Sequence, residues 1–398
     1  MSQTEFIALI AMMFATIAFS IDSMLPALPD IGAELSPSDP NRAQLILTMF
    51  FLGLGVGTLF VGPVSDALGR KPVILAGAAV YIVAALVAYV AESLEVVLAA
   101  RVVQGLGAAA PRVVALAIMR DLYSGRIMAR MMSIAMLIFA IFPAFAPLMG
   151  AGIIALAGWR AIFLAFVVFS LISITWMYVR LPEPLPPSAR RPLRLNLILM
   201  AIREMASHAS VRISVAVQTL CMAILLSMLS SVQQIYEQTF DRAAEFPFWF
   251  CAVAGISASG SLLNAALVVR FGMRRMVTWT LAMQIVMSSL MLALSAAHLG
   301  PVAAFATFLL WQASVFFMAG TALGNLNAIA MEPLGHIAGT AASAFGAITT
   351  VLASLLAVPV GLAFDGTPRP LALGILIMSA VSLAWMLRMA AVERRKPV

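Results

Sequence analysis

Three ionisable side chains stand inside long apolar stretches of this sequence: Asp22, Arg101 and Arg112. An Asp or Arg at the centre of a membrane-spanning helix costs about 2.5–3.5 kcal/mol on insertion scales, so a helix that carries one needs a reason. A carboxyl group inside a helix bundle can bind and release a proton, and a nearby guanidinium can tune that binding or hold an anionic group. These residue types therefore favour proton binding linked to the binding of a small molecule.

Asp22 follows a stripe of small residues at helical spacing: Ala8, Ala11, Ala15 and Ala18. Small residues on one face let helices approach closely, so we expect the carboxyl group to point into the bundle and not at lipid. The first hypothesis is a proton-binding site. The alternative is that Asp22 lies at the membrane interface and ends the helix before Pro26 and Pro29.

Arg101 and Arg112 are eleven residues apart, almost three helical turns, which places both on one stripe with Gly105 and Ala108. Two cations on a small-residue face favour a cavity wall, where Arg101 would take part in proton coupling. The alternative is that one arginine bonds backbone carbonyls of a neighbouring helix and that Arg112 reaches toward the cytoplasm.

Amides replace charges in the second half of the chain, where Gln284 and Gln312 also stand within apolar runs. Such amides can line a cavity or can simply bond neighbouring helices together. Asn325 and Asn327 have glycines nearby, which makes close contact plausible. The predicted substrate-cavity residues are Gln104, Arg112, Gln218, Asn325 and Asn327.

Composition fixes the class of protein that carries these residues. The chain has 398 residues, of which 63% are hydrophobic and 10% charged, and its mean hydropathy is +1.04. A soluble domain has too little interior for so much apolar side chain, which excludes a soluble enzyme, a disordered chain and a disulfide scaffold. Both cysteines lie in apolar runs and the three histidines lack ligand spacing, so no metal site or cofactor is expected.

Twelve apolar runs are long enough to cross a bilayer as helices. We expect the first to be a membrane helix and not a signal peptide, because its leading segment has no Lys or Arg and Asp22 interrupts its end. We predict an all-α integral membrane protein of two six-helix bundles, with spans near 6–26, 44–64, 73–91, 95–118, 132–157, 160–180, 212–234, 246–269, 276–297, 302–330, 337–362 and 370–390.

A proline-rich connection divides the spans six and six. The stretch from Pro182 to Pro192 holds five prolines in eleven residues and cannot be a membrane helix. The predicted organisation is an N-terminal bundle over 1–181, a linker over 182–211 and a C-terminal bundle over 212–398. A shift of 203 residues carries Gly69-Arg70-Lys71 close to Gly272–Arg275. Two related halves are a transporter design with the substrate cavity between them.

The distribution of the basic residues between the two sides of the membrane indicates the topology of the chain. Of the 24, eighteen fall on the side of the two termini, four on the other side, and two within a span. The positive-inside rule then places both termini in the cytoplasm. We expect the chain to lie in the inner membrane of a bacterial cell. The net charge of +7 therefore indicates membrane orientation and not nucleic-acid binding, and we expect a functional monomer whose partners are the lipid bilayer and a small-molecule substrate.

The segment from Gly62 to Lys71 resembles the loop signature of the major facilitator superfamily, G-x-x-x-D-R/K-x-G-R-R/K, with Ala67 in place of one basic residue. The resemblance implies a twelve-helix transporter fold. It also implies a network that closes the cytoplasmic side when the carrier faces outward, formed by Gly62, Asp66, Gly69, Arg70, Lys71 and Asp121.

Three further segments, Ser20–Pro29, Arg101–Gly107 and Pro147–Gly152, resemble motifs of drug:proton antiporters of the bicyclomycin/chloramphenicol-resistance type. The resemblance ties Arg101 to proton coupling. It also implies that an antiporter motif of Pro147, Gly150 and Gly152 seals the carrier against leak, although Ala146 and Ala151 replace glycines of the pattern.

The expected function is a proton-coupled multidrug efflux carrier that works by alternating access, with H⁺ as the coupling ion and no cofactor. The first alternative is a proton-coupled transporter, exporter or symporter, of one metabolite such as a sugar or amino-acid derivative. The second is a membrane-embedded enzyme or sensor, for which His336 and Glu332 are the nearest candidate groups. They more simply end a helix near Pro333, so no enzyme activity is expected.

Overall fold

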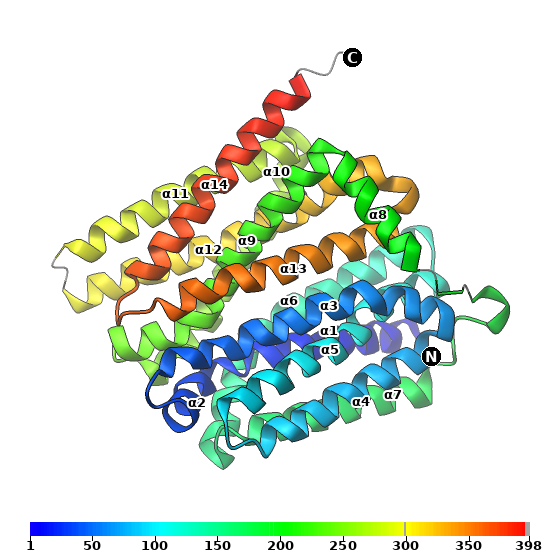
Figure 1. The fold of residues 1–398 in the computed structure, drawn as a ribbon, viewed down its shortest axis with the longest axis horizontal. Coiled ribbons are helices and arrows are strands. Elements are labelled where there is room, and N and C mark those ends of the chain that lie inside the picture. Colours follow the sequence, from blue (N-terminus) through cyan, green and yellow to red (C-terminus); the bar gives the residue numbers. More distant parts are fainter. Residues whose placement is uncertain (191, 194, 298–299, 395–398) are drawn as a thin grey trace. The chain divides into compact units, whose positions relative to one another are not determined.

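The computed structural model describes residues 1–190, 192–193, 195–297 and 300–394. Throughout these residues the regular structure is helical (Figure 1). Arg191, Arg194, Arg395 and Lys396, four of the basic residues behind the charge asymmetry, lie outside them. The chain forms two compact units, Met1–Leu197 (unit 1) and Ile198–Val398 (unit 2).

Unit 1 contains seven α-helices in its described residues. They are α1 (Gln3–Asp22), α2 (Leu28–Leu35), α3 (Leu45–Leu68), α4 (Arg70–Tyr89), α5 (Leu94–Leu122), α6 (Gly125–Ala157) and α7 (Ala161–Arg180). The boundary with unit 2 falls within α8 (Leu195–Ser207). Unit 2 continues with α9 (Ala209–Gln234), α10 (Phe246–Phe271), α11 (Met273–Ala296), α12 (Pro301–Met331), α13 (Ala338–Leu362) and α14 (Arg369–Arg394). Each predicted apolar run overlaps one long helix.

Eleven helical segments of the described chain are long and apolar enough to cross a membrane. The longest runs from Pro301 to Leu362 and has 62 residues. It consists of α12, a 3₁₀ segment over Glu332–Ile337 and α13, and Leu334 in its middle has non-helical backbone angles. As one straight helix it would be roughly 93 Å long, about three times the thickness of the hydrocarbon core.

The first predicted span is not one continuous α-helix, although its apolar helical segment runs from Gln3 to Leu35. α1 stops at Asp22, and the chain continues as a 3₁₀ turn over Leu25–Ala27 and then as α2. Proline has no backbone N–H, so Pro26 cannot bond the Asp22 carbonyl four residues earlier, and the helical ladder stops there. Asp22 therefore lies at the end of a helix and not within a longer one.

The seventh span runs further than predicted. After α9 the chain forms a π-helical turn over Ile235–Thr239, and the apolar segment extends to Thr239. The buried ring of Tyr236 packs against Phe246, with the ring centroids 5.2 Å apart, and anchors this turn. The segment includes Glu237, so unit 2 also carries an ionisable residue within a span.

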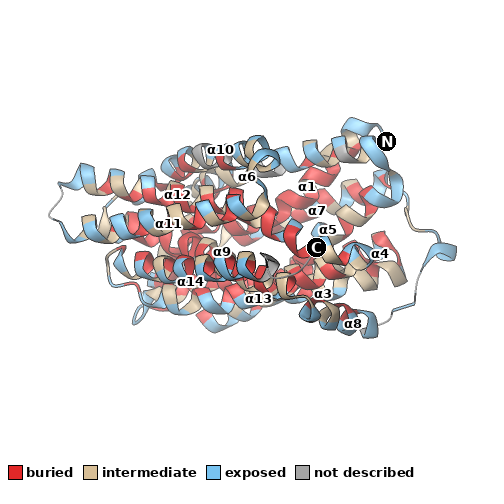
Figure 2. Ribbon diagram, turned by 90° about the horizontal axis from the view of Figure 1, so that it is seen from above, coloured by how far each residue is buried: buried red, intermediate tan, exposed pale blue. Residues whose placement is uncertain are grey.

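Helix α5 is central to unit 1 because glycines let it approach its neighbours closely. A Cβ atom on Gly105 would stand 2.1 Å from the Phe50 carbonyl oxygen of α3, and one on Gly77 of α4 would stand 2.3 Å from the Cβ of Ala110. Only glycine fits such contacts. Helix α1 is buried along most of its length (Figure 2). This packing places Asp22 and Arg101 inside unit 1.

Candidate functional site

Asp22 is buried at the end of α1, with 5% of its surface exposed. Within the described residues no hydrogen bond or ion pair reaches its carboxyl group. A charged carboxylate in such a place is costly, because neither bulk water nor a cation compensates it. The position suits a group that takes up and gives off a proton.

The predicted antiporter motif packs against the turn that carries Asp22. A Cβ atom on Gly150 of α6 would stand 2.1 Å from the carbonyl oxygen of Ser23, the residue after Asp22. Pro147 is buried beside it, whereas a Cβ atom on Gly152 would meet nothing within 4 Å. Of the two motif glycines, Gly150 is therefore the one that the packing requires.

Arg101 is fully buried and bonds only neutral acceptors. Its Nη2 donates to the Ser20 carbonyl of α1 at 3.0 Å, its Nε to the Ile46 carbonyl of α3 at 3.3 Å, and its Nη1 to Gln104 Oε1 at 2.6 Å. The guanidinium also lies over the Phe50 ring, 4.3 Å from the centroid. Arg101 thus bonds the carbonyls of two neighbouring helices, one of them two residues before Asp22.

Tyr81 of α4 belongs to the same cluster, and the sequence interpretation missed it. Its hydroxyl group is hydrogen-bonded to the hydroxyl of Ser20, and both residues are buried. The available signal was a tyrosine inside an apolar run, since a buried phenol needs a polar partner. The cluster of Ser20, Tyr81, Arg101 and Gln104 joins α1, α4 and α5.

Arg112 differs from Arg101 in its exposure to solvent. It is exposed, whereas Arg101 has no exposed surface. Both residues lie on α5, which runs unbroken from Leu94 to Leu122, so the structure distinguishes them by exposure and not by helix geometry. A substrate role for Arg112 stays a prediction.

The other predicted cavity amides are described within their own units. Gln104 is buried against Arg101. In unit 2, Gln218 is half-buried and Asn327 is exposed, whereas Asn325 donates to Asn264 Oδ1 at 2.7 Å and so bridges α12 to α10. Substrate contact by these amides stays a prediction, and Asn325 at least has a role in helix packing.

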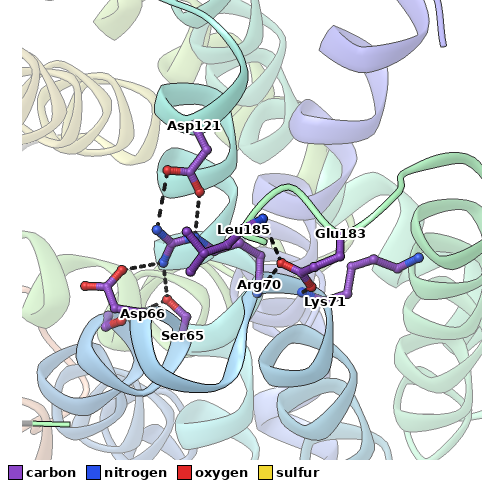
Figure 3. A network of polar contacts seen from close by, with 8 residues as sticks. Ser65, Asp66, Arg70, Lys71, Asp121, Glu183 and Leu185 are labelled. Atoms are coloured by element: carbon purple, nitrogen blue, oxygen red, sulfur yellow. Dashed lines mark hydrogen bonds and ion pairs between the residues drawn. The ribbon is translucent and has the colours of Figure 1, made fainter. Parts of the chain in front are cut away.

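The residues of the predicted gating network meet around Arg70, at the start of α4 (Figure 3). The buried guanidinium donates to Asp121 Oδ2 at 2.7 Å, to Asp66 Oδ1 at 2.6 Å and to Ser65 Oγ at 2.7 Å. Gly69 has φ +106°, a conformation that favours glycine and lets α3 end directly before α4 begins. Gly62 accepts a bond from Ser65 through its carbonyl. The ion pair of Arg70 with Asp121 expected from the motif is present.

Glu183 completes this network, and the sequence interpretation missed it. Its two carboxylate oxygens accept the backbone N–H groups of Arg70, at 2.8 Å, and Lys71, at 2.9 Å (Figure 3). Lys71 Nζ in turn donates to the carbonyl of Tyr178 at 2.9 Å. Glu183 lies in the proline-rich linker, where nothing local pointed to a partner more than a hundred residues away. The start of the linker is thus bonded to the start of α4.

Unit 2 has a similar arrangement at the start of α11. Gly272 has φ +83°, and Arg274 Nη2 lies 2.7 Å from Glu332 Oε2. His336 Nε2 lies 2.8 Å from Glu204 Oε1 of α8. Glu332 and His336, the groups considered for an enzyme, both lie in the 3₁₀ segment after α12. Each is therefore paired with a residue of a neighbouring helix.

Comparison with known proteins decides the family. The family model of the Major Facilitator Superfamily matches residues 8–358. The chain belongs to the Major Facilitator Superfamily. Its members are transporters, so this chain is a multi-pass membrane transporter of a small molecule and not an enzyme.

Relatives within the superfamily confirm the resemblance to the bicyclomycin-resistance type. The chain is 28% identical over 344 residues to a bicyclomycin resistance protein homolog of Haemophilus influenzae, covering 85% of this chain and 84% of the relative. It is 30% identical over 245 residues to the multidrug resistance protein MdtL of Escherichia coli, covering 61% of each.

Two solved structures share the fold. A D-xylose–proton symporter matches with a TM-score of 0.76 and 12% identity, over 96% of this chain and 97% of that one. The human organic anion transporter MFSD10 matches with a TM-score of 0.66 and 16% identity, over 97% and 99%. At such low identity the likeness concerns the helical architecture alone.

Proposed function

We propose that this chain is a proton-coupled multidrug efflux carrier, a drug:proton antiporter that exports small amphipathic compounds by alternating access. The observation that carries the proposal is the buried carboxyl group of Asp22, which has no bonded partner within the described residues and lies two residues from the Ser20 carbonyl held by Arg101. The names of the relatives, a bicyclomycin resistance protein homolog and a multidrug resistance protein, support drugs as the substrates.

The proposed topology has twelve membrane crossings with both termini in the cytoplasm, in the inner membrane of a bacterium. The length of the 62-residue segment supports counting α12 and α13 as two crossings. The distribution of basic residues supports the orientation. In this topology the six membrane-crossing helices before the 182–211 linker form one bundle and the six after it form the other, and the carrier acts as a monomer.

In the proposed cycle, Asp22 takes up a proton from the outside, which releases the substrate. The carrier then reorients, and Asp22 loses the proton on the inside as a new substrate binds. Each proton that enters down a potential of 100 mV supplies about 2.3 kcal/mol, before any pH gradient is added. Arg101 and Gln104 set the surroundings of Asp22, and the proton is the coupling ion without a further cofactor.

The Arg70 network is the proposed gate of the cytoplasmic side. Its ion pairs with Asp66 and Asp121 tie α3, α4 and α5 together, and they must separate or move together whenever that side opens. Gly150 keeps α6 tight against the Asp22 turn and limits leakage of protons. The proposed substrate contacts are Gln104, Arg112, Gln218, Asn325 and Asn327.

Transport into proteoliposomes with an imposed pH gradient tests the proposal. The wild type should move chloramphenicol or bicyclomycin only while the gradient lasts. Asp22→Asn should lose this transport while it remains folded and inserted. The matched control Asp39→Asn changes an exposed aspartate and should transport normally. Full gradient-driven transport by Asp22→Asn would contradict the proposal, and saturable transport of D-xylose or one amino acid without any drug would favour a metabolite carrier.

A further inference from the structure

Unit 1 encloses a small cavity between α1, α4, α5 and α7, with a volume of about 10 Å³. A buried water molecule needs roughly 10–15 Å³ and two to four polar partners, so the space suits one water and no larger ligand. The lining residues that matter here are Met13, Thr16, Tyr81, Ser170, Ser173 and Met177.

Two serine hydroxyl groups of α7 line this cavity without a hydrogen-bond partner in the described part of the chain. Ser170 is 3% exposed and Ser173 is 4% exposed, so bulk solvent does not satisfy them. Hydroxyl groups on helices commonly donate to the carbonyl four residues earlier, as Ser20 does to Thr16 at 2.8 Å. A buried hydroxyl without a partner is destabilising because it has lost its hydrogen bonds to water, so two of them lining one cavity indicate a polar occupant.

The opposite wall offers further polar groups. Tyr81, whose hydroxyl bonds Ser20, lines the cavity, and so do Gly107 and Pro111 of α5. Pro111 has no N–H group and cannot supply the helical bond to the Gly107 carbonyl four residues earlier. The Gly107 carbonyl therefore receives no helical hydrogen bond from residue 111 and can accept one from another donor.

We propose that this cavity binds a single water molecule. The water bonds the hydroxyl groups of Ser170 and Ser173 on one side and the Tyr81 hydroxyl or the Gly107 carbonyl on the other. It connects α7 to the cluster of Ser20, Tyr81 and Arg101. This inference concerns hydration of unit 1 and stands whether or not the chain exports drugs.

The methionines of the cavity make the water measurable. Met13 and Met177 are 1% and 0% exposed, and methionine is readily oxidised by hydroxyl radicals. Met119 is also 0% exposed and lies in the same hydrophobic cluster, but it does not line the cavity. A bound water ionised by an X-ray pulse generates its radical in place, so it oxidises Met13 and Met177 and spares Met119.

The test is X-ray footprinting of the full-length protein in lipid nanodiscs, with mass spectrometry of the methionine peptides. We expect Met13 and Met177 to be oxidised faster than Met119, because only the first two line the cavity that holds the proposed water. Equal oxidation of all three methionines would mean a dry cavity and would overturn the proposal.

A double variant tests whether the hydroxyl groups of Ser170 and Ser173 bind the water. In Ser170→Ala/Ser173→Ala the cavity keeps its apolar lining but loses two polar partners, and oxidation of Met13 and Met177 should fall to the rate of Met119. Unchanged fast oxidation in that variant, with Met119 still protected as evidence of folding, would contradict the assignment of the serines. Should the variant fail to fold, the wild-type comparison alone decides whether water is bound.

Discussion

Removal of the Glu183 carboxylate tests how the linker is attached to the gating network. Glu183 accepts the N–H groups of Arg70 and Lys71, the first two residues of α4, whose N-cap Gly69 has no side chain to bond them. The carboxylate therefore acts as the helix cap from a distant part of the chain. Loss of a capping side chain costs about 0.5–2 kcal/mol. At about 1.4 kcal/mol per factor of ten, Glu183→Ala should raise local opening roughly 2- to 30-fold.

Hydrogen–deuterium exchange measures this opening directly. The peptide that contains Arg70 and Lys71 should exchange faster by that factor in Glu183→Ala, and Glu183→Gln, which keeps one acceptor oxygen, should show a smaller increase. Glu204→Ala is the matched control, because Glu204 pairs with His336 in unit 2 and should leave this peptide unchanged. Exchange at the wild-type rate in Glu183→Ala would refute the reasoning.

Three further experiments test the packing and the ion pairing of the site residues. Gly150→Ala should lower the melting temperature, since overpacking costs about 1–3 kcal/mol, whereas Gly152→Ala should leave it unchanged; equal effects would contradict the assignment. Arg101→Lys should also lower the melting temperature, because one ammonium group cannot serve all three acceptors and each unsatisfied one costs about 1–3 kcal/mol. A double-mutant cycle of Arg70→Ala and Asp121→Ala in denaturant unfolding should give a coupling of about 0.5–3 kcal/mol, and strict additivity would speak against the ion pair.

The sequence predicts the long helices well because a bilayer requires about 20 apolar residues for each crossing. It predicts their ends less well, since ends depend on local backbone chemistry. Pro26 ends α1 at Asp22, and a π-helical turn carries the seventh span past Gln234 to Thr239. Hydropathy alone reports neither effect.

The site is predictable in its residue types and less so in its contacts. The cost of charge in the bilayer points to Asp22 and Arg101, and the motif points to the pairing of Arg70 with Asp121. Two of the three acceptors of Arg101 are backbone carbonyls, which every residue has, so no pattern identifies Ser20 and Ile46 in advance. Only tertiary packing brings them to the guanidinium.

Contacts between residues far apart in the sequence are a second kind of contact that sequence analysis misses. Glu183 lies 113 residues from Arg70 and meets a helix N-terminus, a partner without a side-chain signature. The surroundings of Arg112 are likewise not readable from its spacing, since the sequence does not show that Arg101 is buried and Arg112 exposed.

The central claim, that Asp22 exchanges a proton against substrate, is tested most directly by proton release on binding. Purified protein in weakly buffered detergent solution, at a pH where substrate binds, is mixed with a transported drug, and a pH-sensitive dye reports the protons set free. We expect the wild type to release about one proton per bound drug, following the linkage of protonation to binding, and Asp22→Asn to bind the drug without release. Equal proton release by the wild type and Asp22→Asn would contradict the account.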